Sequence, residues 1–286
     1  MQQSCQLCQD CHLINYLEKN SWLLVKCQNC GLVQLGQQFD TKELSSLYDE
    51  TFFARGKFNI DITTKLENTR RLKYLKKCGI LSGSRLLEIG CGIGDFVFAA
   101  KKNYNISGFD VSSFAIDASK KLNPEIADQL IVGTIADVLY PDHFFDAVVL
   151  WDVIEHSQDF SSMIKFSRRK LKLGGKIILS TPNIGHLTAK LAGRHWSFLI
   201  PPLHVVFFDK TTIYRLLSSH QFQPIFWTTK GRWVSFQFFA FKVESILPKI
   251  FVYLIAKIAK TRFLSHIPIY IPTGDIQYVC GELINK

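Results

Sequence analysis

The chain has 286 residues and a net charge of +10, and its 47% hydrophobic and 20% charged residues are typical of a globular protein with a large core. It contains no uncharged apolar run of about 18 residues, which argues against a membrane-spanning helix. Residues 1–159 carry 16 Lys and Arg against 20 Asp and Glu, whereas residues 160–286 carry 18 against 4. The basic second half is expected either to meet an anionic partner, such as a phosphate-bearing substrate, nucleic acid or a membrane surface, or to form a solvated face. Because Met1–Ser4 show no signal-peptide pattern, we expect a cytoplasmic location, with peripheral membrane contact as an alternative.

Five of the eight cysteines lie in the first 30 residues. Two C-x2-C pairs are separated by 18 residues, and each pair can place two thiolates on one metal ion from a tight turn. Clustered pairs without a secretory signal favour metal over disulfides. They predict a structural Zn²⁺ site in a zinc ribbon over residues 1–40, with the ligands Cys5, Cys8, Cys27 and Cys30. Cys11 and His12 are alternative ligands, and a set of reduced, unrelated cysteines is the alternative to a metal site.

Residues 41–80 are expected to form a helical linker or lid, because apolar residues recur at helical spacing and 60–77 is a longer amphipathic segment. From residue 85 onward, β-rich runs alternate with helical segments. This alternation predicts a parallel α/β sheet that binds its ligand at the carboxyl edge of the strands. The expected strands are 22–27 in the ribbon and then 86–89, 106–110, 130–132, 147–151 and 176–180; the expected helices are 95–101, 113–122 and 211–219.

The first strand of this alternation ends in the glycine-rich stretch Glu88-Ile89-Gly90-Cys91-Gly92-Ile93-Gly94-Asp95. Glycines let the main chain approach a ligand closely, as in the G-x-G-x-x-G turn that binds a pyrophosphate. Here Asp95 stands at the last position of that fingerprint, and both Glu88 and Asp95 would repel a pyrophosphate. The stretch therefore favours a cationic ligand without phosphate, and S-adenosylmethionine, with its sulfonium and ammonium groups, is such a ligand.

This stretch resembles the E/D-x-G-x-G-x-G loop of class I S-adenosylmethionine-dependent methyltransferases. Segments 108–112, 133–137, 145–156 and 171–176 resemble further elements of the same family, in the same order. The resemblance implies a Rossmann-like, doubly wound α/β domain over residues 81–286, with a seven-stranded sheet whose strand seven is antiparallel. It implies a cofactor site in which Asp110 accepts the ribose hydroxyls and Asp137 meets the adenine amino group. The implied cofactor-binding residues are Glu88, Gly90, Cys91, Gly92, Gly94, Asp110, Val111, Asp137 and Trp151.

Segments 24–33, 43–50 and 203–208 resemble a subgroup of this family that has an N-terminal zinc-binding segment and is found with polysaccharide and natural-product biosynthesis. The resemblance implies methyl transfer to a small-molecule acceptor, expected to be a sugar, nucleotide-sugar or lipid-linked intermediate. The alternatives are an RNA methyltransferase with a zinc knuckle and a quinone-type O-methyltransferase at the membrane surface. Nucleic acid is disfavoured, because residues 1–40 contain only Lys19 and Lys26 as basic residues.

Two histidines are candidate catalytic bases, since methyl transfer is an in-line displacement for which the protein supplies position, desolvation and sometimes a base. His156 follows the strand at 147–151, and His204 lies on the loop after 176–180. For each of them, a packed loop histidine is the alternative. The set Asp152, Glu155 and His156 is also similar to the E-x-x-E-H of ubiquinone-pathway O-methyltransferases, which leaves a divalent ion as a further alternative.

Strands 224–229 and 276–284 are expected to form the antiparallel end of the sheet, with an aromatic, basic insert at 230–275 between them. The hydrophobic density of the insert indicates that it buries against something. A helical cap over the site, a membrane-surface contact and a dimer face are the alternatives.

Overall fold

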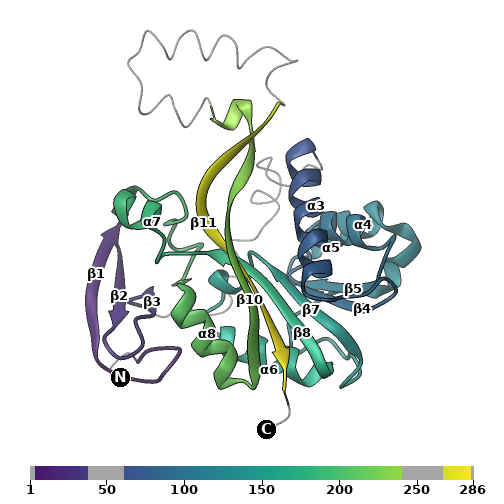
Figure 1. Cartoon of the computed structure of the whole chain (residues 1–286), viewed down its shortest axis with the longest axis horizontal. Coiled ribbons are helices and arrows are strands. Elements are labelled where there is room, and N and C mark those ends of the chain that lie inside the picture. The colour runs from purple at the N-terminus through teal and green to yellow at the C-terminus, as the bar shows by residue number, and fades with distance from the viewer. Residues whose placement is uncertain (1–3, 38–60, 240–266, 285–286) are drawn as a thin grey trace.

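The computed structural model describes residues 4–37, 61–239 and 267–284 (Figure 1). Its strands form two sheets. A seven-stranded sheet has the order β10-β11-β8-β7-β4-β5-β6, and a four-stranded sheet has the order β1-β2-β3-β9. The larger sheet lies in the middle of the molecule, and the strands β1, β2 and β3 lie at one side of it.

The larger sheet is parallel except for β11, which runs antiparallel to both of its neighbours, β8 and β10. This arrangement confirms the Rossmann-like sheet with an antiparallel strand seven that the sequence predicted. Its parallel strands pair directly from β6 to β8. The strands are β4 (Arg85–Ile89), β5 (Asn105–Asp110), β6 (Leu130–Val132), β7 (Phe145–Trp151), β8 (Leu171–Pro182), β10 (Phe222–Ser235) and β11 (Pro268–Leu283).

Helices cover both faces of this sheet (Figure 1). Side chains alternate along each strand, so Leu86 joins one buried cluster and Leu87 the other. The Leu86 cluster includes residues of α3 (Ile62–Lys77), α4 (Asp95–Ala100) and α5 (Ser113–Leu122). The Leu87 cluster includes residues of α6 (Phe160–Lys170) and α8 (Lys210–Ser219). The shorter helices are α7 (Leu187–Ala192), η1 (Pro124–Gln129), η2 (Ile154–His156) and η3 (Gly193–His195).

The four-stranded sheet joins the N-terminal segment to the rest of the chain. It contains β1 (Leu13–Lys19), β2 (Trp22–Cys27), β3 (Val33–Leu35) and β9 (Val206–Phe207). The strand expected at 22–27 is present as β2. The sequence did not predict β9, which follows β8 and pairs antiparallel with β3, and the Leu35 N–H donates to the carbonyl of Val205 at 2.9 Å. The ribbon is therefore built onto the segment that carries His204.

The hairpin of β10 and β11 is longer than predicted. β8 pairs with β11 only over Ile276–Glu282, whereas β10 and β11 stay paired as far as Ser235 and Pro268. The hairpin therefore extends beyond the sheet, as Figure 1 shows. The insert expected at 230–275 begins and ends with strand residues, and its central part, 240–266, lies outside the described residues. So do residues 41–60 of the expected helical linker.

Within the described ranges, no helix combines the length and the apolar character that crossing a membrane requires.

Candidate functional site

The glycine-rich stretch forms a tight turn between β4 and α4. The N–H groups of Gly90 and Cys91 both donate to the carbonyl of Phe109 on β5, at 2.9 and 3.0 Å. Gly90 has a positive φ of 70°, and a Cβ there would lie 2.7 Å from a methyl carbon of Val153. Only glycine is accommodated at this position, so the turn presents bare main chain at the carboxyl edge of the sheet.

Asp110 ends β5 beside this turn. Its Oδ2 accepts the Gly92 N–H at 2.9 Å, and its Oδ1 accepts the Ser112 N–H at 3.0 Å. Burial raises the pKa of Asp110, while these backbone donors act in the opposite direction. Each carboxylate oxygen can accept more than one hydrogen bond, so Asp110 keeps acceptor capacity for ligand hydroxyls next to the glycines.

Glu88 lies on β4 directly before the turn and is 3% exposed. Its Oε2 is buried and has no hydrogen-bond partner among the described residues. Burial raises the pKa of Glu88 well above its usual range, and the charges of Asp95 and Asp110 raise it further, while Arg71 opposes the shift. A buried acid surrounded by other acids favours a cation as its ligand.

The ligand-free protein is expected to lose stability as the pH rises above the ordinary glutamate pKa of 4.5. The folded state holds the Glu88 proton more tightly than the unfolded chain does. The resulting stabilisation is complete below the unfolded pKa and is lost as the pH rises through the raised folded pKa, at up to about 1.4 kcal/mol per pH unit. Urea unfolding of the wild type and Glu88→Gln across this range measures the difference. Because other buried carboxyls are common to both proteins, parallel curves would contradict this assignment.

Arg71 of α3 reaches the end of β7 and is a site residue that the sequence analysis did not identify. Its guanidinium pairs with Asp152 at 2.8 Å, and Ser180 of β8 donates to the other carboxylate oxygen of Asp152 at 2.8 Å. The charges of Asp152 and Asp95 raise the pKa of Arg71 against its burial. Arg71 also lies over the ring of Trp151, 5.4 Å from its centroid. A permanently charged guanidinium therefore lies at the carboxyl edge of the sheet, near Glu88.

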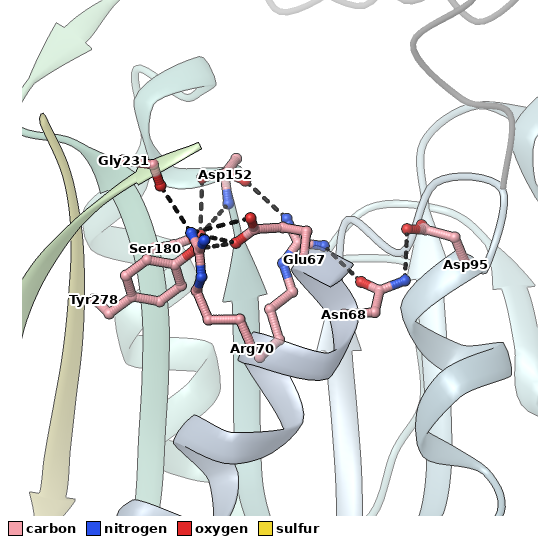
Figure 2. Close-up of polar contacts among 9 residues, drawn as sticks. Glu67, Asn68, Arg70, Asp95, Asp152, Ser180, Gly231 and Tyr278 are labelled. Atoms are coloured by element: carbon pink, nitrogen blue, oxygen red, sulfur yellow. Dashed lines mark hydrogen bonds and ion pairs between the residues drawn. The ribbon is translucent and has the colours of Figure 1, made fainter. Parts of the chain in front are cut away.

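A polar network ties α3 to this edge (Figure 2). Asn68 donates to Asp95 of α4 at 3.0 Å, so it links α3 to the end of the glycine turn. Arg70 donates to the carbonyl of Gly231 on β10 at 2.7 Å, and Tyr278 of β11 donates to Glu67. The α3 part of the helical segment expected at 41–80 therefore covers the carboxyl edge of the sheet.

The other predicted cofactor residues lie at or after the carboxyl ends of β4, β5, β6 and β7. Cys91 is buried within the glycine turn, and Trp151, which ends β7, packs against Phe96 with ring centroids 5.3 Å apart. Val111, which follows β5, is exposed. Asp137 is also exposed, and its carboxylate accepts hydrogen bonds from the N–H and the hydroxyl of Thr134.

The two candidate catalytic histidines lie together although 47 residues separate them in the chain. The rings of His156 and His204 are 4.7 Å apart and edge to face. Nδ1 of His156 lies 2.8 Å from the carbonyl of Leu203, and Val205 donates its N–H to the carbonyl of Glu155 at 2.9 Å. Of the three residues considered for a divalent ion, Asp152 directs its carboxylate to Arg71 and Ser180. The potential metal-ligating atoms of Glu155 and His156 lie within 4.8 Å of that of His204.

The four predicted metal-ligating cysteines converge at one end of the ribbon. The sulfur atoms of Cys5, Cys8, Cys27 and Cys30 all lie within 4.8 Å of one another. The Cys5–Cys30 and Cys8–Cys27 separations are 3.5 and 3.6 Å. Four thiolates around Zn²⁺ at 2.3 Å would be about 3.8 Å apart, so these residues fit a tetrahedral zinc site.

Cys11 and His12, the alternative ligands, are both exposed and outside this cluster. His12 is held instead by Asp10, whose Oδ1 lies 2.7 Å from its Nδ1. Burial raises the pKa of Cys5 to about 11. A bound metal would have to displace protons from buried thiols, which links metal binding to folding.

The family model of the methyltransferase domain matches residues 62–225, from the start of α3 into β10. The match covers more than half of the chain, and the chain therefore belongs to this family. Together with the fold, this supports the class I S-adenosylmethionine-dependent methyltransferase that the sequence predicted.

Individual proteins show the same similarity. Phosphoethanolamine N-methyltransferase 1 of Zea mays is 33% identical over 114 residues, which are 38% of this chain and 22% of that protein. The ubiquinone biosynthesis O-methyltransferase of Alkalilimnicola ehrlichii is 34% identical over 144 residues, which are 47% of this chain and 58% of that protein. The chain thus spans less than two thirds of the length of these relatives.

Solved structures share the fold at low sequence identity. Magnesium protoporphyrin IX methyltransferase from Synechocystis PCC 6803, solved with bound SAH, has a TM-score of 0.56 at 16% identity, and the match covers 85% of this chain and 100% of that one. A SAM-dependent methyltransferase from Archaeoglobus fulgidus has a TM-score of 0.55 at 17% identity, covering 82% and 100%.

Proposed function

We propose that the protein binds S-adenosylmethionine at the glycine turn and transfers its methyl group to a small-molecule acceptor. The observation that carries this proposal is the arrangement of charges around bare main chain. Buried Glu88 suits the cationic part of the ligand, and Asp110 offers acceptors for the ribose hydroxyls. Arg71 offers a guanidinium to the amino-acid carboxylate. This one ligand carries a partner for each of the three groups.

S-adenosylmethionine, when bound, supplies an activated methyl group, so the protein has to position the acceptor and exclude water. Val111, Asp137 and Trp151 are proposed to line the adenosine end of the site. Asp137 would exchange its bonds with Thr134 for one with the adenine amino group. Closure of α3 over the sheet edge, through Arg71 and Asn68, would keep water from the reacting atoms.

His156 and His204 are proposed to receive the proton that the acceptor loses. A carbonyl can only accept a hydrogen bond, so Nδ1 of His156 donates to Leu203 and its Nε2 is the basic atom. Neutral histidine is a good base near pH 7, and the ring contact places the second histidine directly beside the first. Within the described residues, the cluster of Glu155 with these histidines lies at the start of β9, between the ribbon and the larger sheet.

The acceptor is proposed to be a sugar, nucleotide-sugar or lipid-linked intermediate, and the cysteine cluster to hold a structural Zn²⁺. The four thiols support the zinc proposal, and the similarity to phosphoethanolamine and ubiquinone methyltransferases supports a small-molecule acceptor. Residues 1–40 would then belong to the subgroup with an N-terminal zinc-binding segment.

Isothermal calorimetry with S-adenosylmethionine tests the cofactor site. Asp110→Ala is expected to weaken binding at least tenfold, because charged hydrogen bonds of this kind contribute about 1.5–3 kcal/mol. Asp117→Ala, an exposed aspartate on α5, is the matched control and should bind as the wild type does. An unchanged dissociation constant in Asp110→Ala, or no heat of binding in the wild type, would refute the proposal.

A further inference from the structure

Arg232 stands at an irregularity of the long hairpin. Lys230 pairs with Ile276, but Arg232 pairs with Ile271, so residues 272–275 of β11 bulge opposite Gly231. A Cβ on Gly231 would lie 1.8 Å from the carbonyl oxygen of Ile271, and this contact makes the bulge depend on glycine. The bulge ends at Asp275, which is 2% exposed. Arg232 and Asp275 therefore owe their positions to the same bulge.

Among the described residues, the guanidinium of Arg232 has no countercharge in contact with it. Its Nη2 donates to the hydroxyl of Ser197 at 3.0 Å, whereas its Nε is buried and has no partner in the part of the chain that the structure describes. Within the described ranges no carboxylate lies within ion-pair distance of Arg232, while Arg71 has Asp152 at 2.8 Å. Burial lowers the pKa of Arg232, and among the described residues only the charge of Asp275 opposes this shift. Burying a cation without a paired anion is costly.

Asp275 is engaged elsewhere. Its Oδ2 accepts the indole N–H of Trp196 at 2.8 Å, and its Oδ1 is buried without a partner in the described ranges. Trp196 and Ser197 belong to the same loop, which continues to His204. One loop therefore fixes Asp275 in place and supplies the only hydrogen bond that the guanidinium of Arg232 makes among the described residues.

Aromatic rings connect Arg232 to the candidate base. The guanidinium lies 4.8 Å from the ring centroid of Phe198 and 5.8 Å from that of Phe238. Phe198 stacks on His204 with centroids 6.4 Å apart and planes 13° apart, and His204 contacts His156. On its other side, the strand at Gly231 is bound by Arg70 of α3 (Figure 2). The ring of Phe198 thus lies between Arg232 and His204, and Arg232 is close to α3, the helix that covers the proposed cofactor site.

We propose that Arg232 binds an oxyanion of the methyl acceptor, a phosphate or carboxylate group, and so selects anionic acceptors. The inference rests on the proposed function, because it takes the oxyanion bound at Arg232 to be part of the methyl acceptor. A guanidinium presents paired N–H donors that match the oxygens of a phosphate or carboxylate, and it keeps its charge when desolvated. The bound oxyanion would supply the countercharge that Arg232 does not find among the described residues.

Thermal unfolding of the full chain with inorganic phosphate tests this site. Phosphate, compared with chloride at equal ionic strength, is expected to raise the Tm of the wild type in a saturable manner, because a ligand of the folded state stabilises it. Arg232→Gln should weaken the apparent phosphate affinity at least tenfold. Arg169→Gln, an exposed arginine of α6, is the matched control and should respond as the wild type does. Acetate replaces phosphate in a second arm, and vesicles of phosphatidic acid in phosphatidylcholine distinguish a lipid phosphate from a free one.

Calorimetry with S-adenosylmethionine on the same samples separates this inference from the proposed function. Suppose that the wild type binds S-adenosylmethionine, but that its affinity for phosphate, acetate and phosphatidic acid vesicles does not depend on Arg232. The oxyanion site is then wrong, and the cofactor site stands. If S-adenosylmethionine does not bind, the proposed function fails whatever the anions do. Should Arg232→Gln not fold, Arg232→Lys keeps the charge but loses the paired donors. Wild-type affinity for every probe in that variant would also overturn the proposal.

Discussion

Cys27→Ser is expected to abolish zinc binding and to lower the free energy of unfolding by at least about 3 kcal/mol. A structural zinc site contributes on the order of 10 kcal/mol to the folding of a small zinc domain, and the loss of one thiolate removes much of this. Cys27 ends β2, its sulfur lies 3.6 Å from that of Cys8, and its N–H donates to the carbonyl of Leu32 before β3. The substitution therefore affects the turn that leads into β3.

The effect should extend beyond the ribbon. The buried side chain of Gln34 on β3 accepts the N–H of Gln6, which lies between Cys5 and Cys8, at 2.9 Å. The backbone of Gln34 pairs with Val206 of β9. Loosening of β3 should therefore speed amide hydrogen exchange in 205–207, next to His204, while S-adenosylmethionine binding at the glycine turn stays unchanged.

We expect elemental analysis to find about one zinc ion per wild-type chain, because four thiolates complete one tetrahedral site. Cys11→Ser is the matched control, because Cys11 is exposed and outside the cluster, and it should keep both metal and stability. Full zinc content in Cys27→Ser would exclude the four-thiolate site. Metal loss without faster exchange in 205–207 would show that the ribbon does not support β9.

The sheet and the glycine turn could be predicted because their determinants are local. The alternation of β-rich runs with helices fixes a parallel sheet, and the spacing of the two cysteine pairs fixes which thiols converge. The lengths of β8, β10 and β11 were underestimated. β10 and β11 hydrogen-bond to each other even where neither strand packs against β8. Their pairing therefore continues beyond the edge of the larger sheet, where the hydrophobic pattern no longer marks a strand.

Arg71, β9 and the Arg232 cluster could not be predicted because they depend on contacts between distant segments. On sequence alone, Glu67 and Arg71 form an i,i+4 pair on an exposed helix face. In the structure Glu67 pairs with Arg70 instead, and Arg71 turns inward to Asp152, 81 residues away. A two-residue strand such as β9 has no periodicity of its own, and its pairing is set by β3. The histidines were identified singly, but only tertiary structure shows that they touch.

Gly94→Ala is expected to lower the free energy of unfolding by about 2–5 kcal/mol and to weaken S-adenosylmethionine binding at least tenfold. Gly94 is the N-cap of α4 with φ 76°, a conformation that costs a residue with a Cβ about 1–2 kcal/mol. The new Cβ would also lie 2.0 Å from Oγ of Ser119 and 2.7 Å from Nδ2 of Asn123. Both side chains are buried, and Asn123 donates to the Gly94 carbonyl at 3.2 Å, so neither can move freely. Overpacking of this kind adds about 1–3 kcal/mol.

Gly79→Ala separates the two contributions. Gly79 follows α3 with nearly the same φ, 75°, but a Cβ there would meet nothing within 4 Å. That variant should lose only the conformational part, about 1–2 kcal/mol, and should bind S-adenosylmethionine normally. Because about 1 kcal/mol corresponds to a Tm shift of about 2–4 °C in a protein of this size, thermal unfolding resolves the two variants. If both variants lose the same Tm, α5 must shift to make room for the new methyl group at position 94. In that case, an intact affinity for S-adenosylmethionine in Gly94→Ala would show that the ligand does not need the main chain at the start of α4.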